Sequence, residues 1–431
     1  MAPVISPVQT STAMPKSTTV VVIGGGIVGL VTALTLAERG VPVVVLEKGR
    51  LAGEQSSRNL GWVRKTSRSV ADLPMALESD RLWNAMATRV GEDVGYRPAG
   101  IMFLAKTEAE FNAHRRWMTA TQGLSLDSRL VTPKEIDHLV PGGTGQWVGG
   151  VHTPSDGRAE PTLASSAIAR AALAKGAVIL ENCAVRTLSL SGGSVCGVVT
   201  EKGEIACDQV VLAGGLWSRR FLGNLGVFLP TLPLECYAIR TAPMEGPTEI
   251  AVGGPNFSFR KRMDGGFTIC QRGAVGSPLV LDHARLGLRY LPMFREGRHQ
   301  LRISFGKAFF DDLRLARRWR ASDTTPFETV RTMDPRVNHG INAEAMDNIR
   351  AAWPTFAAAR VEQVWGGTMD ITPDSLPVID HVERLPGLIV ASGFSGHGFG
   401  TAPAAGQLAA DLVTGEKPIV DPTPYRLGRL Q

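Results

Sequence analysis

The chain has 431 residues, 44% of them hydrophobic and 20% charged, which predicts a globular protein of two or three domains rather than a disordered or fibrous one. Its formal net charge is +6, but Lys and Arg are scattered through most of the sequence, so nucleic acid binding is not implied. The five cysteines match neither a zinc site nor a disulfide framework, which favours no metal and a reducing cytoplasm as the compartment.

Residues 1–17 are rich in Ser, Thr and Pro and contain no long apolar stretch. We expect a disordered leader here rather than a signal peptide. The apolar stretch Val20–Leu36 is interrupted by four glycines, and no other segment is long enough to cross a bilayer. The sequence therefore predicts a protein that is not integral to a membrane.

An apolar strand over 19–23 runs into Gly24-Gly25-Gly26-Ile27-Val28-Gly29, then a helix, then a second strand that ends at Glu47. Gly24 permits the tight turn, Gly26 lets the backbone approach a pyrophosphate, and Gly29 lets the helix pack closely on its strand. Glu47 lies at the spacing of the acid that binds a ribose. The pattern predicts a dinucleotide site but leaves FAD and NAD(P) as alternatives.

Later segments extend the same sheet. We expect a long helix over 73–89, a helix from Pro161 through Leu173, a strand over 177–180, a hairpin over 198–208 and a buried strand over 209–213. The chain then ends in a strand over 387–391, a glycine turn, and a helix from about Pro403 to Val413, stopped by Gly415.

Stretches over 96–106, 232–241 and 258–270 are instead typical of antiparallel strands, which predicts a second sheet that covers the cofactor. Residues 283–319 have a helical, Arg-rich pattern, and a shorter helix is expected over 343–357. The densest basic run, 314–320, is interpreted as a solvated or subunit-facing surface rather than a nucleic acid patch.

The predicted fold is α/β: a Rossmann-like dinucleotide domain with a discontinuous α+β substrate domain that contains an antiparallel sheet. The dinucleotide domain is assigned to 18–90, 150–222 and 365–431. The substrate domain is assigned to 91–149 and 223–364.

Five motifs together resemble the D-amino-acid oxidase-like family of FAD oxidoreductases, which includes glycine oxidase, sarcosine oxidase and D-amino-acid dehydrogenases. They are the segments 24–47, 55–61, 213–218, 372–379 and 393–399. The resemblance implies FAD as the cofactor. The residues that it implies for FAD binding are Gly24, Gly26, Ile27, Val28, Gly29, Glu47, Lys48, Ser56, Ser57, Arg58, Asn59, Leu60, Gly61, Val185, Ala213, Gly214, Trp217, Gly393, Ser395, Gly396, His397 and Gly398.

Backbone N–H groups of the turn 393–398, at the start of a helix, would stabilise negative charge on one edge of the flavin. His397 either adds a donor there or only steadies the turn. The family's chemistry is oxidation of a C–N bond: hydride moves to the flavin, and the resulting imine is hydrolysed.

Three departures from better-known members alter the prediction. Where relatives carry a Trp-x-Gly-x-Arg pattern whose arginine binds the substrate carboxylate, this chain has Met369, which cannot do so. Candidate replacements are Arg64, Lys65, Arg68, Arg260 and Arg262, each of which is otherwise a surface charge. Thr268 stands where sarcosine oxidases carry a lysine that helps O₂ react, which favours a dehydrogenase. No cysteine follows Cys270, so the flavin should be noncovalent.

The expected substrate is a secondary or N-substituted amine, a D-amino acid or an opine-like compound. Electrons would pass to a quinone, an electron-transfer protein or O₂. One alternative is a flavin-binding subunit of a hetero-oligomeric dehydrogenase with little activity alone. An NAD-linked enzyme is disfavoured because it would leave the motifs at 56–61 and 393–398 unexplained. Whether the chain forms a homo-oligomer is left open.

Overall fold

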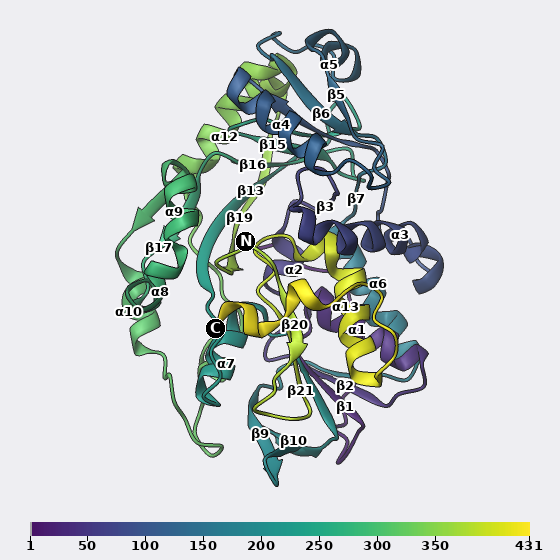
Figure 1. Ribbon diagram of the computed structural model, residues 1–431, viewed down its shortest axis with the longest axis vertical. Coiled ribbons are helices and arrows are strands. Elements are labelled where there is room, and N and C mark those ends of the chain that lie inside the picture. Colours follow the sequence, from purple (N-terminus) through teal and green to yellow (C-terminus); the bar gives the residue numbers. More distant parts are fainter. Residues whose placement is uncertain (1) are drawn as a thin grey trace.

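In a computed structural model, which describes residues 2–431, the chain forms two large sheets with helices packed against them (Figure 1). The first sheet is parallel except for one edge strand, as a dinucleotide-binding sheet requires. In spatial order its strands are β20 (Val378–His381), β21 (Leu388–Ser392), β12 (Gln209–Leu212), β1 (Val20–Ile23), β2 (Val43–Leu46) and β8 (Val178–Leu180).

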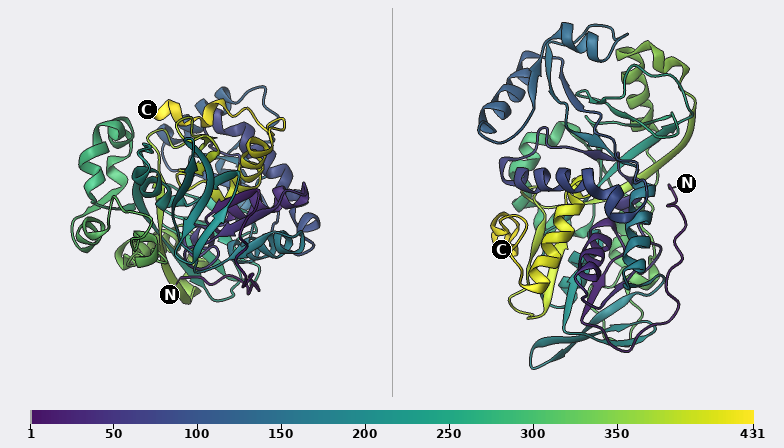
Figure 2. Two further views of the ribbon diagram at one scale, coloured as in Figure 1. Left: turned by 90° about the horizontal axis from the view of Figure 1, so that it is seen from below. Right: turned by 90° about the vertical axis from the view of Figure 1, so that its right-hand side faces the viewer.

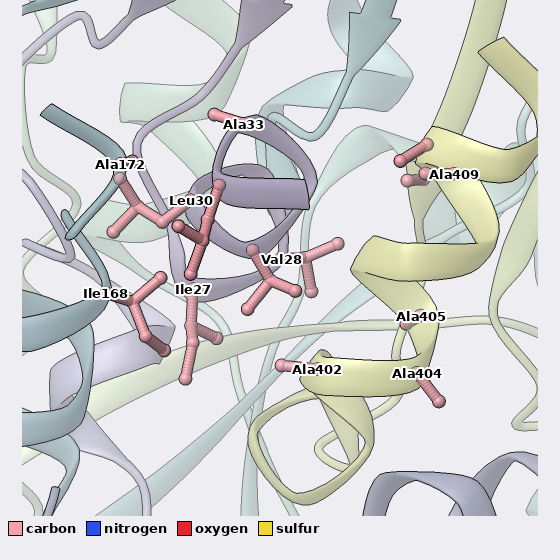
Figure 3. Packing of buried hydrophobic residues seen from close by; sticks show 14 of the residues in the cluster. Ile27, Val28, Leu30, Ala33, Ile168, Ala172, Ala402, Ala404, Ala405 and Ala409 are labelled. Carbon is pink, nitrogen blue, oxygen red and sulfur yellow. The ribbon is translucent and has the colours of Figure 1, made fainter. Parts of the chain in front are cut away.

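Four helices from distant parts of the chain pack together beside this sheet: α1 (Ile27–Glu38), α3 (Leu73–Val90), α6 (Pro161–Ala174) and α13 (Gly398–Thr414). Figure 3 shows side chains of α1 between alanines of α13 and apolar residues of α6. A Cβ at Gly406 of α13 would lie 2.7 Å from Val31 of α1, so this glycine lets the two helices approach closely. The small three-stranded sheet, β9 (Val185–Ser191), β10 (Ser194–Thr200) and β11 (Gly203–Ala206), and helix α7 (Ser218–Asn224) complete this part.

The second sheet is mostly antiparallel. In spatial order its strands are β18 (Leu301–Ser304), β17 (Val275–Pro278), β13 (Leu232–Thr241), β16 (Phe267–Cys270), β15 (Ser258–Lys261), β14 (Ala251–Gly253), β4 (Ile101–Ala105), β6 (Gly149–Thr153) and β5 (Arg129–Val131), and β19 (Val361–Ile371) pairs along β13. An aromatic core that includes Phe259, Phe267, Trp353 and Phe356 joins it to α12 (His339–Ala352). The remaining elements are α2 (Gln55–Arg58), β3 (Trp62–Val63), α4 (Glu108–Ala120), α5 (Pro133–Leu139), β7 (Gly157–Arg158), α8 (Leu281–Leu286), α9 (Leu291–Gly297), α10 (Lys307–Arg314) and α11 (Pro326–Thr329), with short 3₁₀ turns between them.

The predicted fold class is confirmed: a parallel, Rossmann-like sheet lies beside a discontinuous unit with an antiparallel sheet. The proposed boundaries at residues 150 and 365 fall inside β6 and β19, which are both strands of the second sheet. Each strand continues its ladder across the boundary, because hydrogen-bonded pairing does not follow local changes in composition.

The leader differs from the disordered tail that its composition predicts. Figure 2 shows it as an extended segment along the edge of the molecule. The Ser6 N–H donates to Thr162 O (3.2 Å) and the Ser11 N–H to Ile179 O (2.8 Å), while Ile5 and Val8 pack against the helix cluster. These contacts are with residues far along the chain, and composition alone could not show them.

Two helix predictions also need correction. The helical pattern over 283–319 is broken into α8, α9, the strand β18 and α10, with Gly287, Gly297 and Gly306 at the junctions. Helix α13 begins five residues before the predicted start, and Pro403 lies inside it. No helix among residues 2–431 combines the length and the apolar character that crossing a bilayer would need.

Candidate functional site

A cavity lies between the two sheets. Its wall includes Gly24, Gly26 and Ala213 at the carboxyl ends of the parallel strands, and Cys236 and Met369 from β13 and β19. The loop that follows α11 adds Arg331 and Thr332. The cavity therefore lies at the edge of an open parallel sheet where dinucleotides bind.

The glycine turn has the close contacts expected of it. Gly24 has φ +112°, and a Cβ there would lie 2.4 Å from Ala213 O. A Cβ at Gly29 would lie 2.2 Å from Gly24 O, whereas one at Gly26 would point at Ser56 Oγ (3.1 Å) beside the cavity. Gly29 therefore serves helix packing and does not line the cavity, while Gly24, Gly26, Ile27 and Val28 do.

Glu47 fixes the turn as well as facing the cavity. Its carboxylate accepts hydrogen bonds from the N–H groups of Gly25 (2.8 Å) and Gly49 (2.7 Å). Burial nevertheless raises the Glu47 pKa above its ordinary value. Glu47, which the sequence predicts to contact a ribose, thus also connects the end of β2 to the glycine turn by hydrogen bonds.

Lys48 and Trp217 lie together in the cavity wall. The Lys48 ammonium donates to Glu54 Oε1 (2.9 Å), Val330 O (2.9 Å) and Arg331 O (2.8 Å), and lies 4.4 Å from the Trp217 ring centroid. Trp217 donates from Nε1 to Glu54 as well (3.0 Å). Lys48 is therefore engaged by protein groups, although it lines the cavity with Val185 and Gly214.

The predicted loop at 55–61 contains one helical turn, α2. Ser56, Arg58 and Asn59 line the cavity, and Ser56 Oγ accepts the Ile27 N–H (2.9 Å). The Ser57 hydroxyl bonds to Glu54 O (3.4 Å), and the Arg58 guanidinium bonds to Asp334 (2.6 Å) and Gly366 O (3.0 Å). Ser57, Leu60 and Gly61 are not part of the cavity wall.

The turn before α13 depends on Asp370, which sequence reasoning missed. Asp370 Oδ2 accepts the Gly393 N–H (2.8 Å), its backbone oxygen accepts the Ser395 N–H (3.1 Å), and Oδ1 accepts from Gln55 (3.0 Å). Burial raises the Asp370 pKa to about 6. Gly396 and Gly398 line the cavity, whereas Gly393, Ser395 and His397 do not.

Three of the predicted substrate-binding cations, all buried, are paired with carboxylates of the protein. Lys65 pairs with Asp80 (2.6 Å), Arg68 with Asp72 (3.2 Å), and Arg260 with Glu160 (2.6 Å). Arg260 also donates to Leu60 O. Breaking such a pair leaves an uncompensated buried charge, so these residues hold the fold together. Arg262, also considered, pairs with Asp264 (3.1 Å).

Arg64 differs, because within residues 2–431 it has no carboxylate within ion-pair distance. It donates to Thr66 O (2.5 Å), and its guanidinium carbon lies 5.5 Å from the centroid of Phe103. Arg272, which sequence reasoning missed, lies 4.0 Å from the same centroid and donates only to Gly254 O (3.2 Å) among described protein groups. We call these two residues the Arg64–Arg272 pair.

Both guanidiniums of the pair are electrostatically unsatisfied. Burial and the neighbouring arginines lower the Arg64 pKa well below its ordinary value, and burial lowers the Arg272 pKa to about 10. Arg272 is nevertheless exposed to solvent, so an anion can reach it. A carboxylate bound there would relieve the mutual repulsion of the pair.

His397 joins this group rather than the cavity wall. The His397 Nε2 lies 3.4 Å from the Arg64 guanidinium, and the His397 backbone N–H donates to Phe394 O (2.8 Å). Burial, together with Arg68 and Arg64, lowers the His397 pKa well below its ordinary value, so the imidazole stays neutral.

Thr268 does not reach the cavity. It pairs with Arg240 and Arg260 in the second sheet, and its hydroxyl accepts a bond from Arg262 (3.4 Å). The cavity wall on this side is formed instead by Cys236 and Met369, and Met369 Sδ lies 2.7 Å from where a Gly396 Cβ would be. The neighbouring Cys270 pairs Ala238, and Arg272 follows Cys270 by two residues.

Among the described residues, no group of His, Cys, Asp or Glu is arranged to hold a metal ion, and all five cysteines have free thiols. FAD fits the residues present on two grounds. Gly26 keeps open a space beside the start of α1 that a larger side chain would fill, and Gly396 does the same beside Met369. Gly24, Gly26, Ser56, Asn59 and Gly398 are the groups that would hold it.

The family description "FAD dependent oxidoreductase" matches residues 19–412. The solved structure of L-amino acid deaminase from Proteus myxofaciens in complex with anthranilate is 32% identical, with a TM-score of 0.96 over 100% of this chain and 97% of that chain. Glycine oxidase from Geobacillus kaustophilus is 27% identical over 95% of this chain and 96% of that protein.

Sarcosine oxidase subunit beta from Rhodobacter capsulatus is 23% identical over 91% of this chain and 84% of that protein. Several other curated relatives are longer, and the chain spans less than half of their length. Because the family match runs through both sheets and the whole wall of the cavity, the chain belongs to the D-amino-acid oxidase-like family of FAD-dependent oxidoreductases, and its cofactor is FAD.

Proposed function

We propose that this protein oxidises the C–N bond of an α-amino acid whose carboxylate binds the Arg64–Arg272 pair. The observation that carries the proposal is the presence of two guanidiniums without a carboxylate partner, both in contact with Phe103. Bound FAD would accept hydride from the substrate, and the imine formed would hydrolyse to a keto acid and an amine or ammonia. The expected substrates were N-substituted amines, D-amino acids or opine-like compounds, and similarity to an L-amino acid deaminase adds L-amino acids as the first class to test.

The chain's own residues would orient the substrate. A bidentate carboxylate pair with a guanidinium fixes both distance and direction, which holds the α-carbon in a reactive position. Neutral His397 beside Arg64 would keep that guanidinium in place without adding a third positive charge. Met369 would contribute shape to the cavity and no charge.

We expect an acceptor other than O₂. The side chains that the second sheet contributes to the cavity, Cys236, Met369 and Asp370, include no cation, so none would stabilise the anion formed when O₂ is first reduced. Thr268 has no bearing on the reaction with O₂, because it lies outside the cavity.

A second candidate is a catalytic subunit that needs a partner, which the match to sarcosine oxidase subunit beta favours. The two candidates differ in whether substrate reduces the flavin of the purified protein when no partner is present. A chain that turns over only after addition of a copurifying protein would support the second.

The test is anaerobic addition of L-amino acids, D-amino acids, N-methyl amino acids and the matching decarboxylated amines to the purified holoenzyme. We expect the flavin absorbance to bleach with one amino acid class and not with the matching amines. Colour that returns slowly in air but at once with a quinone analogue would identify a dehydrogenase. Bleaching by amines and amino acids alike would contradict a role for the carboxylate.

A further inference from the structure

The positive charge of this protein is concentrated in one segment. Residues 281–320, which we call the flank segment, contain ten Lys and Arg and four Asp and Glu, a surplus of six. The whole chain contains 46 Lys and Arg and 40 Asp and Glu. The residues outside the flank segment therefore include 36 basic and 36 acidic side chains and have no net charge. The flank segment includes α8, α9, β18 and α10, and its helices project along one side of the molecule (Figures 1 and 2).

The same segment carries most of the exposed apolar surface. Seven of the thirteen large apolar side chains exposed among the described residues lie in it. Leu288 is 89% exposed and Phe305 is 65% exposed. Phe305, Phe309 and Phe310 form a cluster with ring centroids 5.0 to 5.7 Å apart. Exposed aromatic clusters of this kind mark interaction sites.

Asp282 and Asp312 of the segment pair both with arginines of the body of the protein and with Arg317 of the segment, and Asp311 pairs with Lys307 of the segment. Asp282 pairs with Arg219 and Asp312 with Arg220, and both of these arginines belong to α7. In contrast, Arg295 and Arg298 are exposed and have no ion pair among the described residues. The segment therefore presents exposed basic side chains that have no acidic partner within residues 2–431.

We propose that the flank segment docks this protein on an anionic lipid surface, with its arginines among the headgroups and its exposed Phe and Leu side chains at the acyl boundary. Short elements that combine basic and aromatic residues are typical of interfacial binding, and basic residues are attracted to anionic lipids. The centres of protein interfaces are instead depleted of charge, whereas here Arg302, Ile303, Phe305 and Lys307 follow one another closely.

Docking would bring the cavity close to the lipid. The Tyr290 hydroxyl of the flank segment donates to Ile371 O (2.5 Å) at the end of β19. Leu286 and Tyr290 share an apolar cluster with Met369, which lines the cavity. A lipid-soluble electron acceptor could then reach the flavin from the membrane. This consequence rests on the proposed function, whereas the docking itself does not.

The test is cosedimentation of the holoenzyme with vesicles of phosphatidylcholine alone or with one third phosphatidylglycerol. We expect binding to the anionic vesicles and at least about tenfold less to the neutral ones. Raising the salt from about 0.1 M to about 1 M should weaken binding strongly, because the Debye length falls from about 10 Å to about 3 Å. Substrate is not needed, so failure of the proposed function would not affect the result.

Two double variants separate the contributions: Phe305→Ser with Phe310→Ser, and Arg295→Glu with Arg298→Glu. Each should reduce binding about tenfold or more while the flavin spectrum and thermal unfolding stay unchanged. The matched control is Leu190→Ser with Arg116→Glu, an exposed apolar and an exposed basic residue outside the segment. Equal binding by control and variants, or no binding by the intact enzyme, would overturn the proposal. So would concentration-dependent self-association that only the two double variants lose, because it would assign the surface to a second copy.

Discussion

Arg272 and Arg64 approach the same aromatic ring without a counter-ion, which separates them from the other arginines considered for substrate binding. Charge-assisted hydrogen bonds contribute about 1.5–3 kcal/mol each, so Arg272→Met should raise KM for the amino acid by about 10- to 100-fold. The KM for a decarboxylated analogue, if it reacts, should change little. Steady-state kinetics with both compounds would check this.

Arg262→Met is the matched control for this variant, since Arg262, unlike Arg272, has a carboxylate partner, Asp264. Its KM should equal that of the wild type. A similar rise in both variants would show that charge at a distance, rather than contact with the substrate, governs KM.

Buried Asp370 makes the free energy of unfolding depend on pH. Its folded pKa of about 6 exceeds the ordinary value of 3.8, so its contribution to stability is fully present below pH 3.8 and is lost as the pH rises through 6. Asp370→Asn should therefore flatten the decline in the free energy of unfolding over this range. Gln55 can turn its amide to accept from the new Asn, so the hydrogen bond at that side is preserved.

The same variant should make bound FAD easier to reduce above pH 6, because a negative charge beside the cavity is removed. We expect a rise in midpoint potential of roughly 30 mV, equivalent to about 1.4 kcal/mol for a two-electron couple. Potentiometric titration at pH 5 and pH 8 would check it. A shift of the same size at both pH values would contradict the assignment of the proton to Asp370.

Part of the site could be predicted from the sequence because its geometry is local. The turn at Gly24 and Gly26 lies within a few residues of the strand and helix that define it. Arg272 and Asp370 could not be found this way: Asp370 reaches the turn before α13 from β19 of a large sheet, and Arg272 reaches Phe103 of β4 from the loop after β16. Contacts between distant residues also explain why the sequence wrongly predicts that Lys65 and Arg260 bind substrate. Their carboxylate partners, Asp80 and Glu160, lie 15 and 100 residues away in the chain.

At the scale of elements, α13 shows how one helix depends on another. Pro403 lacks an N–H, and α3 supports the backbone around it: Ser79 Oγ donates to Thr401 O (2.9 Å) and accepts from Ala404 N (3.1 Å), and Trp83 donates to Gly400 O (2.9 Å). A proline in a helical pattern predicts a helix start, so the sequence predicts that this helix begins at about Pro403. The α3 contacts allow α13 to begin at the cavity instead.

Ser79→Ala should destabilise the protein by about 1–3 kcal/mol, because it leaves buried backbone groups of α13 unsatisfied. It should also weaken FAD binding, since Gly398 at the start of α13 lines the cavity. Urea unfolding and flavin titration would measure the two effects. Ser322→Ala, at an exposed serine, is the control and should change neither.

At the scale of the whole molecule, the cavity wall combines the ends of the parallel strands with residues of β13 and β19. A ligand held by both sheets should couple their unfolding. Adding FAD at about 100 times its Kd should stabilise the protein by about 2.7 kcal/mol, and we expect both sheets to melt in one transition. Scanning calorimetry of the apoprotein with increasing FAD would check this.

Gly26→Val should prevent FAD binding without changing the core of either sheet. The valine side chain would fill the space beside Ser56 that FAD needs. This variant should lose FAD and its melting temperature should no longer rise with added FAD. Gly223→Val, at a position with open space around it, should behave as the wild type does. If FAD raised the melting temperature of the Gly26→Val variant as much as that of the wild type, the pyrophosphate would have to bind elsewhere. Two separate transitions in the wild-type holoprotein would instead show that FAD is held by one sheet alone, and that the cavity wall from β13 and β19 only covers it.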